Sequence, residues 1–287
     1  MNILICGASG FIGRHLSQAL RQSGRTVTRA VRNPKEASDI PVDFRNDVRK
    51  EVWIPRLTGI DIVINAVGVL RDSENNPMQR LHHETPLALF AACVEAGVKR
   101  VIHFSALGMD DGIATPYFRT RIAAEKALQA MHTGVRWLCL RPSVIYGEDG
   151  TSAQMFRLLA KLPLHLLPMG GTQKMQPVHI NDICAAIMRW INDDNAISQR
   201  VNAVGSEPVT MRGMLDSYRA QLGHSEAWHF DIPEMLIRLA AIMGDRIPAS
   251  PLCSDTLEMM ASNNTADVRA FAHLLGRSPR SYREFIT

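Results

Sequence analysis

The sequence predicts a doubly wound parallel α/β fold followed by a small, mostly helical C-terminal lobe. Short runs of β-branched and apolar residues alternate with helical patterns from residue 2 onward. These runs have largely continuous apolar cores, which is typical of strands that are buried on both faces of a parallel sheet. The glycine-rich stretch GASGFIG (residues 7–13) lies directly between the first strand pattern and the first helix pattern.

Strand and helix patterns follow one another through the first half of the chain. NILIC (2–6) predicts a buried strand, and residues 11–24 predict a helix that ends at Gly24, because glycine is favoured just after a helix. Thr115 and Pro116 have the residue types preferred at a helix N-cap and first turn. Further strand patterns cover 26–31, 61–68 and 100–107, helix patterns cover 86–98 and 115–131, and an apolar segment over 135–147 closes this part.

After about residue 150 the pattern is looser. Residues 176–191 and 200–205 still predict a helix and a strand, and from 210 onward short helix patterns are joined by irregular links. We therefore expect a first domain over residues 1–205 and a small lobe for substrate or partner over 206–287, interleaved in part with the first. The lobe contains several methionines that could line an apolar ligand site or fill the core, namely Met235, Met243, Met259 and Met260.

Composition argues against several classes of protein. The net charge is only +4 and the basic residues are spread along the chain, so neither nucleic acid nor an anionic membrane is an expected partner. No apolar run approaches the roughly 20 residues that span a bilayer, and the first residues leave no room for a signal peptide. The five cysteines form no close pair, which favours buried thiols in a reducing compartment. We expect a cytoplasmic protein.

The glycines of GASGFIG each have a physical role. Gly7 allows a tight turn, Gly10 lets the backbone approach a pyrophosphate, and Gly13 lets the helix pack closely on the strand. The free N–H groups and the positive dipole end of the helix then face the phosphates. The strand–turn–helix context therefore predicts a dinucleotide site.

The residue after the second strand favours NADP(H) over NAD(H). An enzyme that binds NAD usually has an acidic residue there, which accepts hydrogen bonds from the ribose 2′-hydroxyl. The segment TVTRAVRN (26–33) has none, and Arg32 stands at that place. A guanidinium binds a 2′-phosphate well, whereas a carboxylate would repel it. The neighbouring Arg29 and Lys35 are expected to face water.

Several motifs together resemble the extended or atypical short-chain dehydrogenase/reductases, which are related to the nucleotide-sugar epimerases and dehydratases and have a Rossmann fold. The similarity is greatest to the nucleotide-binding accessory subunit of respiratory complex I and its bacterial relatives. The motifs cover roughly residues 1–205: the glycine turn, VRNP, DFRN (43–46), NAVG (65–68), LRPSVIYG (140–147) and VHINDI (178–183). The resemblance implies that DFRN lines the adenine and that NAVG lies beside the cofactor's ribose.

The resemblance also implies an active site. In this family a tyrosine transfers a proton to or from the substrate oxygen, a lysine four residues later holds the ribose, and a serine or threonine after the fifth strand hydrogen-bonds the substrate. Tyr117 matches the tyrosine, but Arg121 stands where the lysine would be, and Ser105 is the candidate hydroxyl beside an alanine at 106. Residues four apart share a helix face, so Arg121 could assist Tyr117, although it cannot release a proton at ordinary pH.

The same residues have a simpler explanation, in which Arg121 and Glu125 form an exposed ion pair and Tyr117 is a buried ring. His179 and Asp182 fit the start of a helix better than catalysis. His82 and His83 are adjacent, which does not suit two ligands on one helix face, so we expect no metal site. The residues predicted to bind the cofactor are Gly7, Ser9, Gly10, Phe11, Ile12, Gly13, Arg32, Asp43, Phe44, Ala66, Val67, Gly68, Tyr117 and Arg121.

Two functions remain open at this point. One is an NADP-dependent oxidoreductase or epimerase-like enzyme that acts on a small, unidentified carbonyl or hydroxyl compound, in which Tyr117, Arg121 and Ser105 are the catalytic residues. The other is a non-catalytic NADP(H)-binding structural or assembly factor with a protein partner. Because Arg121 stands where the family has a lysine, the sequence is compatible with both functions.

Overall fold

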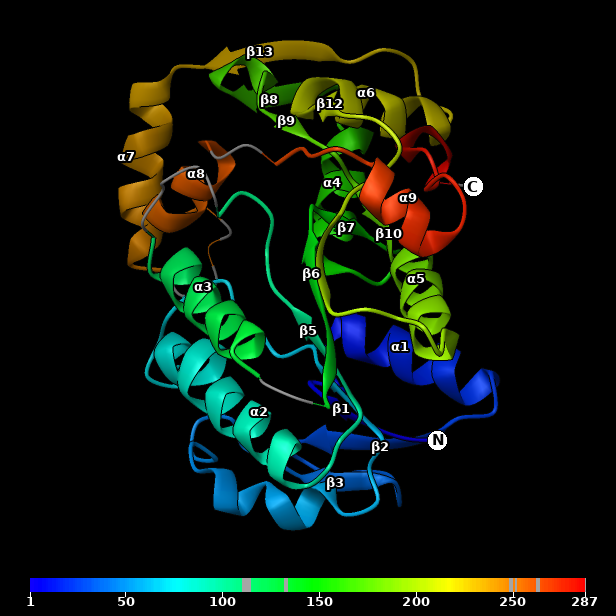
Figure 1. Cartoon of the computed structure of the whole chain (residues 1–287). Helices are drawn as coiled ribbons and strands as arrows, with labels where there is room; N and C mark the ends of the chain where they lie inside the picture. Colours follow the sequence, from blue (N-terminus) through cyan, green and yellow to red (C-terminus); the bar gives the residue numbers. More distant parts are fainter. Residues whose placement is uncertain (110–114, 132–133, 248–249, 251, 262–263, 287) are drawn as a thin grey trace. The chain divides into compact units, whose positions relative to one another are not determined.

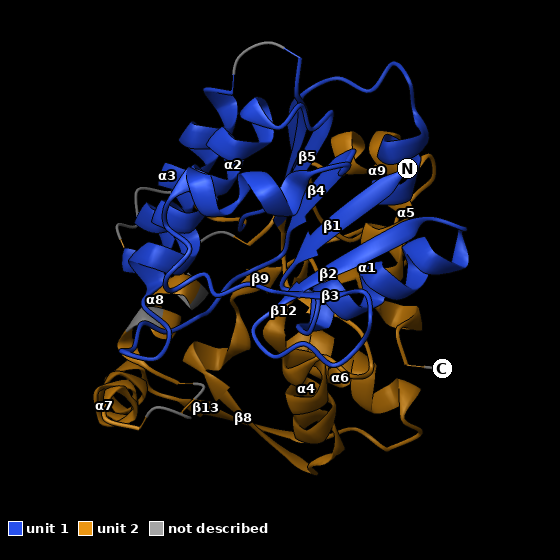
Figure 2. Ribbon diagram, turned by 90° about the horizontal axis from the view of Figure 1, so that it is seen from below, with its two compact units in different colours: residues 1–106, 116–141, 187–201 blue, residues 107–115, 142–186, 202–287 orange. Residues whose placement is uncertain are grey.

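The structure is a computed structural model of the whole chain (Figure 1), and it describes residues 1–109, 115–131, 134–247, 250, 252–261 and 264–286. The chain divides into two compact units, which have different colours in Figure 2. Unit 1 consists of Met1–Ala106, Pro116–Arg141 and Ile187–Val201, and unit 2 consists of Leu107–Thr115, Pro142–Ala186 and Asn202–Thr287. The expected domain boundary after residue 205 stays a prediction about independent folding, which limited proteolysis would test.

The seven-stranded sheet confirms the predicted doubly wound parallel α/β fold. The strand order is β11-β6-β5-β4-β1-β2-β3. The central strand β1 pairs in parallel with β2 on one side and with β4 on the other. The order in which successive strands are added to the sheet therefore reverses between β1 and β4. Ligands bind at such a switch point, outside the carboxyl ends of the strands. The strands are β1 (Asn2–Cys6), β2 (Thr26–Val31), β3 (Asp39–Pro41), β4 (Ile62–Asn65), β5 (Arg100–Phe104), β6 (Arg136–Pro142) and β11 (Gln199–Ala203).

Helices cover both faces of this sheet. Figure 1 draws α2 and α3 on one side of the strands and α1 on the other. The helix α1 ends at Gln22, and Gly24 has the left-handed conformation (φ 78°) that the sequence predicts for it. The helices are α1 (Phe11–Gln22), α2 (Thr85–Glu95), α3 (Pro116–Gln129) and α5 (Ile180–Asn192), whose second half belongs to unit 1.

The core of unit 1 lies against strands that are buried along their length. Every residue of β4 and β5 is buried, which explains why their sequences are mostly apolar and do not alternate with polar residues. Trp53 and Phe90 are completely buried within one apolar cluster that also includes Cys6, Cys93 and Cys139. All five cysteines are buried and free of disulfides, as expected, and burial raises the pKa of the Cys184 thiol to about 12.

Unit 2 is built from helices and short strand pairs. Its helices are α4 (Thr151–Lys161), α6 (Met211–Gln221), α7 (Glu234–Asp245), α8 (Ser254–Ala261) and α9 (Arg269–Leu275). Its strand pairs are β7 (Ile145–Tyr146) with β10 (Val178–His179), β9 (Lys174–Met175) with β12 (Val209–Thr210), and β8 (Leu164–Pro168) with β13 (Trp228–Ile232). In its core, Tyr146 stacks on Phe285 with ring centroids 4.8 Å apart.

Two expectations about unit 2 have clear outcomes. His179 accepts a hydrogen bond from the Asn181 N–H at the start of α5, and buried Asp182 accepts from Arg277 and from the Arg280 N–H, so both residues are structural as expected. Met235 and Met243 are exposed on α7 and do not fill the core.

Among the described residues, no helix is both long and apolar enough to cross a lipid bilayer.

Candidate cofactor and active site

The glycine turn after β1 has no room for a side chain at Gly7 or Gly13. Gly7 has a φ of 76°, and its carbonyl accepts a hydrogen bond from the Gly10 N–H at 2.9 Å. A Cβ atom on Gly13 would lie 2.2 Å from the Gly7 oxygen and 2.7 Å from the Ala8 Cα. Both contacts are with backbone, so the close approach of α1 to β1 depends on glycine at this position.

A cleft of about 180 Å³ opens at the predicted switch point of the sheet. Nine of the predicted cofactor residues line it, namely Gly7, Ser9, Gly10, Arg32, Asp43, Phe44, Ala66, Val67 and Gly68, together with Arg45, Asn76 and Leu81 among others. The other five predicted residues, Phe11, Ile12, Gly13, Tyr117 and Arg121, do not line it. Phe11 packs edge-on against His15, and Gly13 serves the packing of α1 on β1.

Two arginines at this cleft are held differently. Arg45 donates two hydrogen bonds to the Asp43 carboxylate, at 2.9 and 2.7 Å, and these bonds hold the pKa of Asp43 below its usual value. The Arg32 side chain is exposed at the rim of the cleft. The guanidinium of Arg45 is therefore committed to Asp43, whereas that of Arg32 can turn toward an anion.

The helix α3 brings Tyr117 and Arg121 together on a buried face. The guanidinium carbon of Arg121 lies 5.2 Å from the centre of the Tyr117 ring, and Nη1 donates a 2.5 Å hydrogen bond to the carbonyl of Phe104 at the end of β5. A Cβ atom on Gly68 would lie 2.1 Å from Nη2 of Arg121. Arg121 therefore touches the turn after β4, while its role as a helper of Tyr117 and a ribose ligand stays a prediction.

The alternative explanation of this helix, an exposed Arg121–Glu125 pair, is wrong. Both side chains are buried, and Glu125 accepts bidentate hydrogen bonds of 2.8 and 2.7 Å from Arg141 on β6. Arg200 on β11 adds a second positive charge 3.7 Å from the Glu125 carboxylate. This buried ion pair holds α3 against the sheet and thereby fixes where Tyr117 and Arg121 lie relative to the strands.

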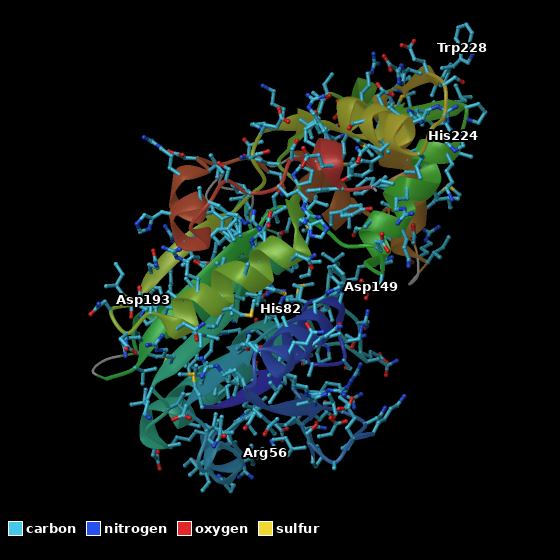
Figure 3. The ribbon with its side chains drawn as sticks, turned by 90° about the vertical axis from the view of Figure 1, so that its right-hand side faces the viewer. Arg56, His82, Asp149, Asp193, His224 and Trp228 are labelled. Atoms are coloured by element: carbon cyan, nitrogen blue, oxygen red, sulfur yellow. The ribbon has the colours of Figure 1, made fainter. Side chains whose placement is uncertain are left out.

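Sequence reasoning missed three polar residues that hold this region. Buried His82 accepts a hydrogen bond from the Val69 N–H at 3.0 Å through Nε2, and its Nδ1 lies 3.2 Å from the Thr120 hydroxyl on α3. Figure 3 shows His82 among the packed side chains. Asn65 accepts from the Val67 N–H and contacts His103 at 3.2 Å. The turn that carries Gly68 is thus tied to both α3 and β5.

The two histidines in this network are neutral. Burial, and after it the positive charge of Arg121, lower the pKa of His82 to about 2 and the pKa of His103 to about 3. A neutral His82 with an accepting Nε2 carries its hydrogen on Nδ1 and donates it to Thr120. The signal for His82 in the sequence is slight, because the side chain belongs to a single π-helical turn (Arg80–Glu84), a feature that spacing does not reveal.

Ser105 lies one residue beyond β5. Its side chain is buried, and its N–H donates to the Leu140 carbonyl at 2.8 Å, which continues the pairing with β6. The segment after it, residues 110–114, lies outside the described residues. The catalytic assignment of Ser105, like that of Tyr117 and Arg121, stays a prediction.

The sheet, the glycine turn and the α3 face define a nucleotide-binding protein of the short-chain dehydrogenase/reductase type. More narrowly, the chain belongs to the NAD dependent epimerase/dehydratase family, whose model matches residues 3–205. A subunit of mitochondrial NADH dehydrogenase from Arabidopsis thaliana (1 alpha subcomplex subunit 9) is 27% identical over 221 residues, which cover 71% of this chain but only 54% of that protein. A ceramide reductase from Caulobacter vibrioides is 28% identical over 196 residues, 66% of this chain and 60% of the relative.

Solved structures show the same fold over the whole chain. A human epimerase family protein with NADPH has a TM-score of 0.76 at 19% identity, with 100% of this chain and 99% of the other covered. A UDP-glucuronic acid 4-epimerase from Bacillus cereus, in complex with UDP-glucuronic acid and NAD, has a TM-score of 0.72 at 20% identity, with coverage of 100% and 96%. At these identities the likeness concerns the fold alone.

The residues present fit an NAD(P) cofactor. The cleft is lined by glycines at the turn after β1, where a side chain on Gly7 would press on the backbone of residues 66 and 67 at about 3.0 Å. Nε of Arg121 is buried and has no hydrogen-bond partner among the residues that the structure describes. A buried donor usually finds an acceptor, and a hydroxyl or phosphate oxygen of a bound dinucleotide is the kind of group that would supply one.

Proposed function

We propose that this protein is an NADP(H)-dependent oxidoreductase or epimerase-like enzyme that acts on a small, apolar carbonyl or hydroxyl compound. The observation that carries the proposal is the buried face of α3, where Arg121 places a permanent positive charge over the Tyr117 ring and against the turn at Gly68. A tyrosine with a fixed cation beside it is suited to proton transfer, and a cation at this turn is suited to a ribose.

The chain's own residues would divide the work between them. NADP(H) would exchange the hydride when bound. Tyr117 would hold or give the proton at its Oη, and Arg121 would orient the ribose. Because arginine does not release its proton at ordinary pH, no proton can pass to solvent through this position. General acid–base catalysis contributes about 10²–10⁴-fold, so a site without the relay would be slow rather than inactive.

The preference for NADP(H) rests on Arg32 at the rim of the cleft and on the absence of an acidic residue in TVTRAVRN. Thermal unfolding of the full chain at matched NADP(H) and NAD(H) concentrations tests it. A tenfold tighter binding adds about 1.4 kcal/mol of stabilisation at saturation. We expect the larger shift from NADP(H), and loss of that difference in Arg32→Asp. Equal shifts in the parent protein would contradict the preference.

An apolar substrate is favoured by unit 2. On α7 the side chains of Met235, Leu239 and Met243 are exposed, and basic residues are few. A nucleotide-sugar diphosphate would need several fixed cations. The Caulobacter relative is named a ceramide reductase, which is consistent with a long-chain compound. Calorimetry should show binding of long-chain carbonyl compounds, and binding of UDP-sugars instead would count against this part of the proposal.

A second function is favoured by Arg121 itself, since it stands where the family has a lysine. The protein would then be a cofactor-binding structural or assembly factor with a protein partner, as the name of the Arabidopsis relative suggests for that subunit. Two observations separate the functions: both predict a bound dinucleotide, but only the enzyme oxidises or reduces it with added substrate and loses that turnover in Tyr117→Phe. A cytoplasmic location stays a prediction, because some of the similar proteins are mitochondrial by name.

A further inference from the structure

The parallel strands β8 and β13 of unit 2 place two histidines side by side. His165 is opposite His229 in the register of the pair. Side chains alternate between the two faces of a strand, so the neighbours of each histidine face away from it. Those neighbours, Leu164, Leu166, Trp228 and Phe230, are exposed, and Figure 3 shows Trp228 projecting outward. The two imidazoles therefore share the face that is turned toward α6.

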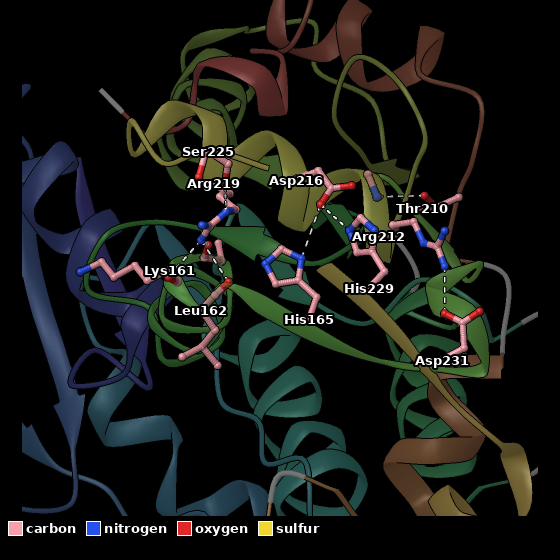
Figure 4. Close-up of polar contacts among 12 residues, drawn as sticks. Lys161, Leu162, His165, Thr210, Arg212, Asp216, Arg219, Ser225, His229 and Asp231 are labelled. Carbon is pink, nitrogen blue, oxygen red and sulfur yellow. Dashed lines mark hydrogen bonds and ion pairs between the residues drawn. The ribbon is translucent and has the colours of Figure 1, made fainter. Parts of the chain in front are cut away.

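The helix α6 presents a carboxylate to both imidazoles. Figure 4 shows His165 and His229 directed at Asp216. Nε2 of His229 lies 2.8 Å from Oδ1 of Asp216, and Nδ1 of His165 lies 3.4 Å from the same oxygen. One ligand atom from each residue lies within 4.8 Å of the other two. Ligands of a tetrahedral zinc ion are about 3.4 Å apart, so His165 and Asp216 already have this spacing. The 2.8 Å contact of His229 with Asp216 would have to lengthen slightly to admit the ion.

The imidazole of His165 is buried and incompletely satisfied. Its side chain is 1% exposed, and among the described residues neither ring nitrogen has a partner of good hydrogen-bond geometry, although the Ala160 backbone interacts with the ring. Burial lowers the pKa of His165, although the nearby Asp216 carboxylate raises it. A neutral imidazole, buried and aimed at a carboxylate, is the form of histidine that binds metal ions.

The surroundings give this cluster access to solvent and a fixed frame. A cleft of about 370 Å³ is lined by Asp216, Arg219, His224, Glu226 and His229 among others. The positive charge of Arg219 is bound by the carbonyls of Ala160, Lys161 and Leu162 at 3.0–3.1 Å, at the end of α4. Arg219 thus holds the backbone that leads into β8, and it does not pair with Asp216.

We propose that His165, Asp216 and His229 bind a divalent metal ion of the zinc class, whose fourth position faces the cleft and is open to water. Two imidazole nitrogens and one carboxylate oxygen form a donor set that zinc prefers, and three protein ligands with an open position are typical of zinc sites that also bind a small ligand. The ion would join β8 and β13 to α6. The three residues come from three elements, which is why the sequence pattern predicted no metal site.

The rival explanation is a metal-free His–Asp–His cluster. In that case His229 donates to Asp216, and His165 stays unbonded beside it. The rival predicts that removal of Asp216 or His229 changes stability but leaves the response to metal ions unchanged. Metal binding predicts the opposite, which makes affinity for Zn²⁺ the deciding measurement.

The experiment uses the full chain without a histidine tag, treated with a chelator and then dialysed. Calorimetric titration with Zn²⁺ should show one equivalent bound with a dissociation constant below about 1 µM, and Co²⁺ should give the strong visible absorption of a tetrahedral site. Asp216→Asn and the partly exposed His229→Gln should each weaken Zn²⁺ binding at least tenfold. His273→Gln, an exposed histidine on α9, is the control and should leave binding unchanged.

Buried His165→Gln is the variant most at risk of misfolding, so the two surface variants decide the question. Zn²⁺ binding that is absent in the parent protein, or equally tight in Asp216→Asn and His229→Gln, would overturn the proposal. A rise in the thermal midpoint with Zn²⁺ in the parent and in His273→Gln, but in neither surface variant, would support it independently of any enzymatic activity.

Discussion

The glycine turn after β1 and the buried face of α3 lie in the same unit and are held in place by different physics. At the turn, backbone packs on backbone, and Gly13 leaves no space for a single methyl group. At α3, polar side chains hold the helix in place, through the Glu125–Arg141 ion pair and the contacts of His82. The first region is therefore specified by residues close together in the sequence, and the second by residues from distant segments.

This difference sets what a sequence can reveal. Steric demands on glycine follow from a local motif, so the turn, its helix and the cleft residues were predictable. Arg121 and Tyr117 were predictable as neighbours because four residues make one helical turn. Their burial was not predictable, since it depends on the ion pair between Arg141 and Glu125. No spacing in the sequence marked His82, and the NAVG motif did not reveal that Asn65 accepts the Val67 N–H.

The largest expected effect on the α3 side comes from removing one member of its buried ion pair. Glu125→Gln leaves the Arg141 charge buried without its bidentate acceptor, and breaking such pairs lowers the free energy of unfolding by about 3–5 kcal/mol. Glu234→Gln breaks an exposed ion pair with Arg238 and should change it by less than about 0.5 kcal/mol. Urea unfolding measures both. Similar losses in the two variants would mean that α3 does not depend on this pair.

The matching test of the turn is Gly13→Ala. The added Cβ meets backbone at 2.2 Å, so α1 must move, and we expect a loss of about 3 kcal/mol together with at least tenfold weaker dinucleotide binding. Gly59→Ala is the control, because its φ of 73° strains an alanine while nothing lies near the new Cβ. That variant should lose about 1 kcal/mol and keep its cofactor affinity. If Gly13→Ala binds normally, the turn is not limited by backbone contact.

Acid should lower the stability of the folded chain through its buried neutral histidines, of which His82 contacts α3. The pKa of His82 is about 2 in the folded state against 6.5 unfolded, so below pH 6.5 the unfolded chain takes up a proton that the folded chain does not. The resulting loss of stability is about 1.4 kcal/mol per pH unit, or about 2 kcal/mol at pH 5. His82→Gln should therefore lose about 2 kcal/mol less than the parent between pH 7 and pH 5. An unchanged pH dependence in urea unfolding would refute a neutral His82.

The smallest effects concern Arg121 and bear on function most directly. Arg121→Ala should weaken dinucleotide binding about tenfold, because the cation at Gly68 is lost, whereas Tyr117→Phe should bind nearly as well as the parent. Arg121→Lys restores the lysine that the family pattern has at this position. It should raise turnover without tighter binding if the protein is a slow enzyme. Cofactor affinity that survives Arg121→Ala would separate this helix from the cofactor altogether.

Unit 2 contains a strand pair that the sequence pattern did not predict. The four helices after residue 210 were expected and are present, but β8 and β13 were not, because WHFDI (228–232) mixes apolar, charged and imidazole side chains. One face of that strand pair is exposed, so its sequence lacks the continuous apolar run that marks β4 or β5. Alternation over five residues is too short to distinguish a strand from an irregular link.

Arg121 has one more consequence, which concerns the life of the protein in a cell. Its Nε is buried without an acceptor, and an unsatisfied buried donor lowers the stability of the cofactor-free chain by about 1–3 kcal/mol. Differences of that size change the unfolded population about 5- to 150-fold, and that population is what proteases degrade. A bound dinucleotide that satisfies Nε would lengthen the half-life of the chain. Abundance of this protein would then follow the supply of its cofactor, so that a fall in the dinucleotide pool removes the protein as well as its ligand.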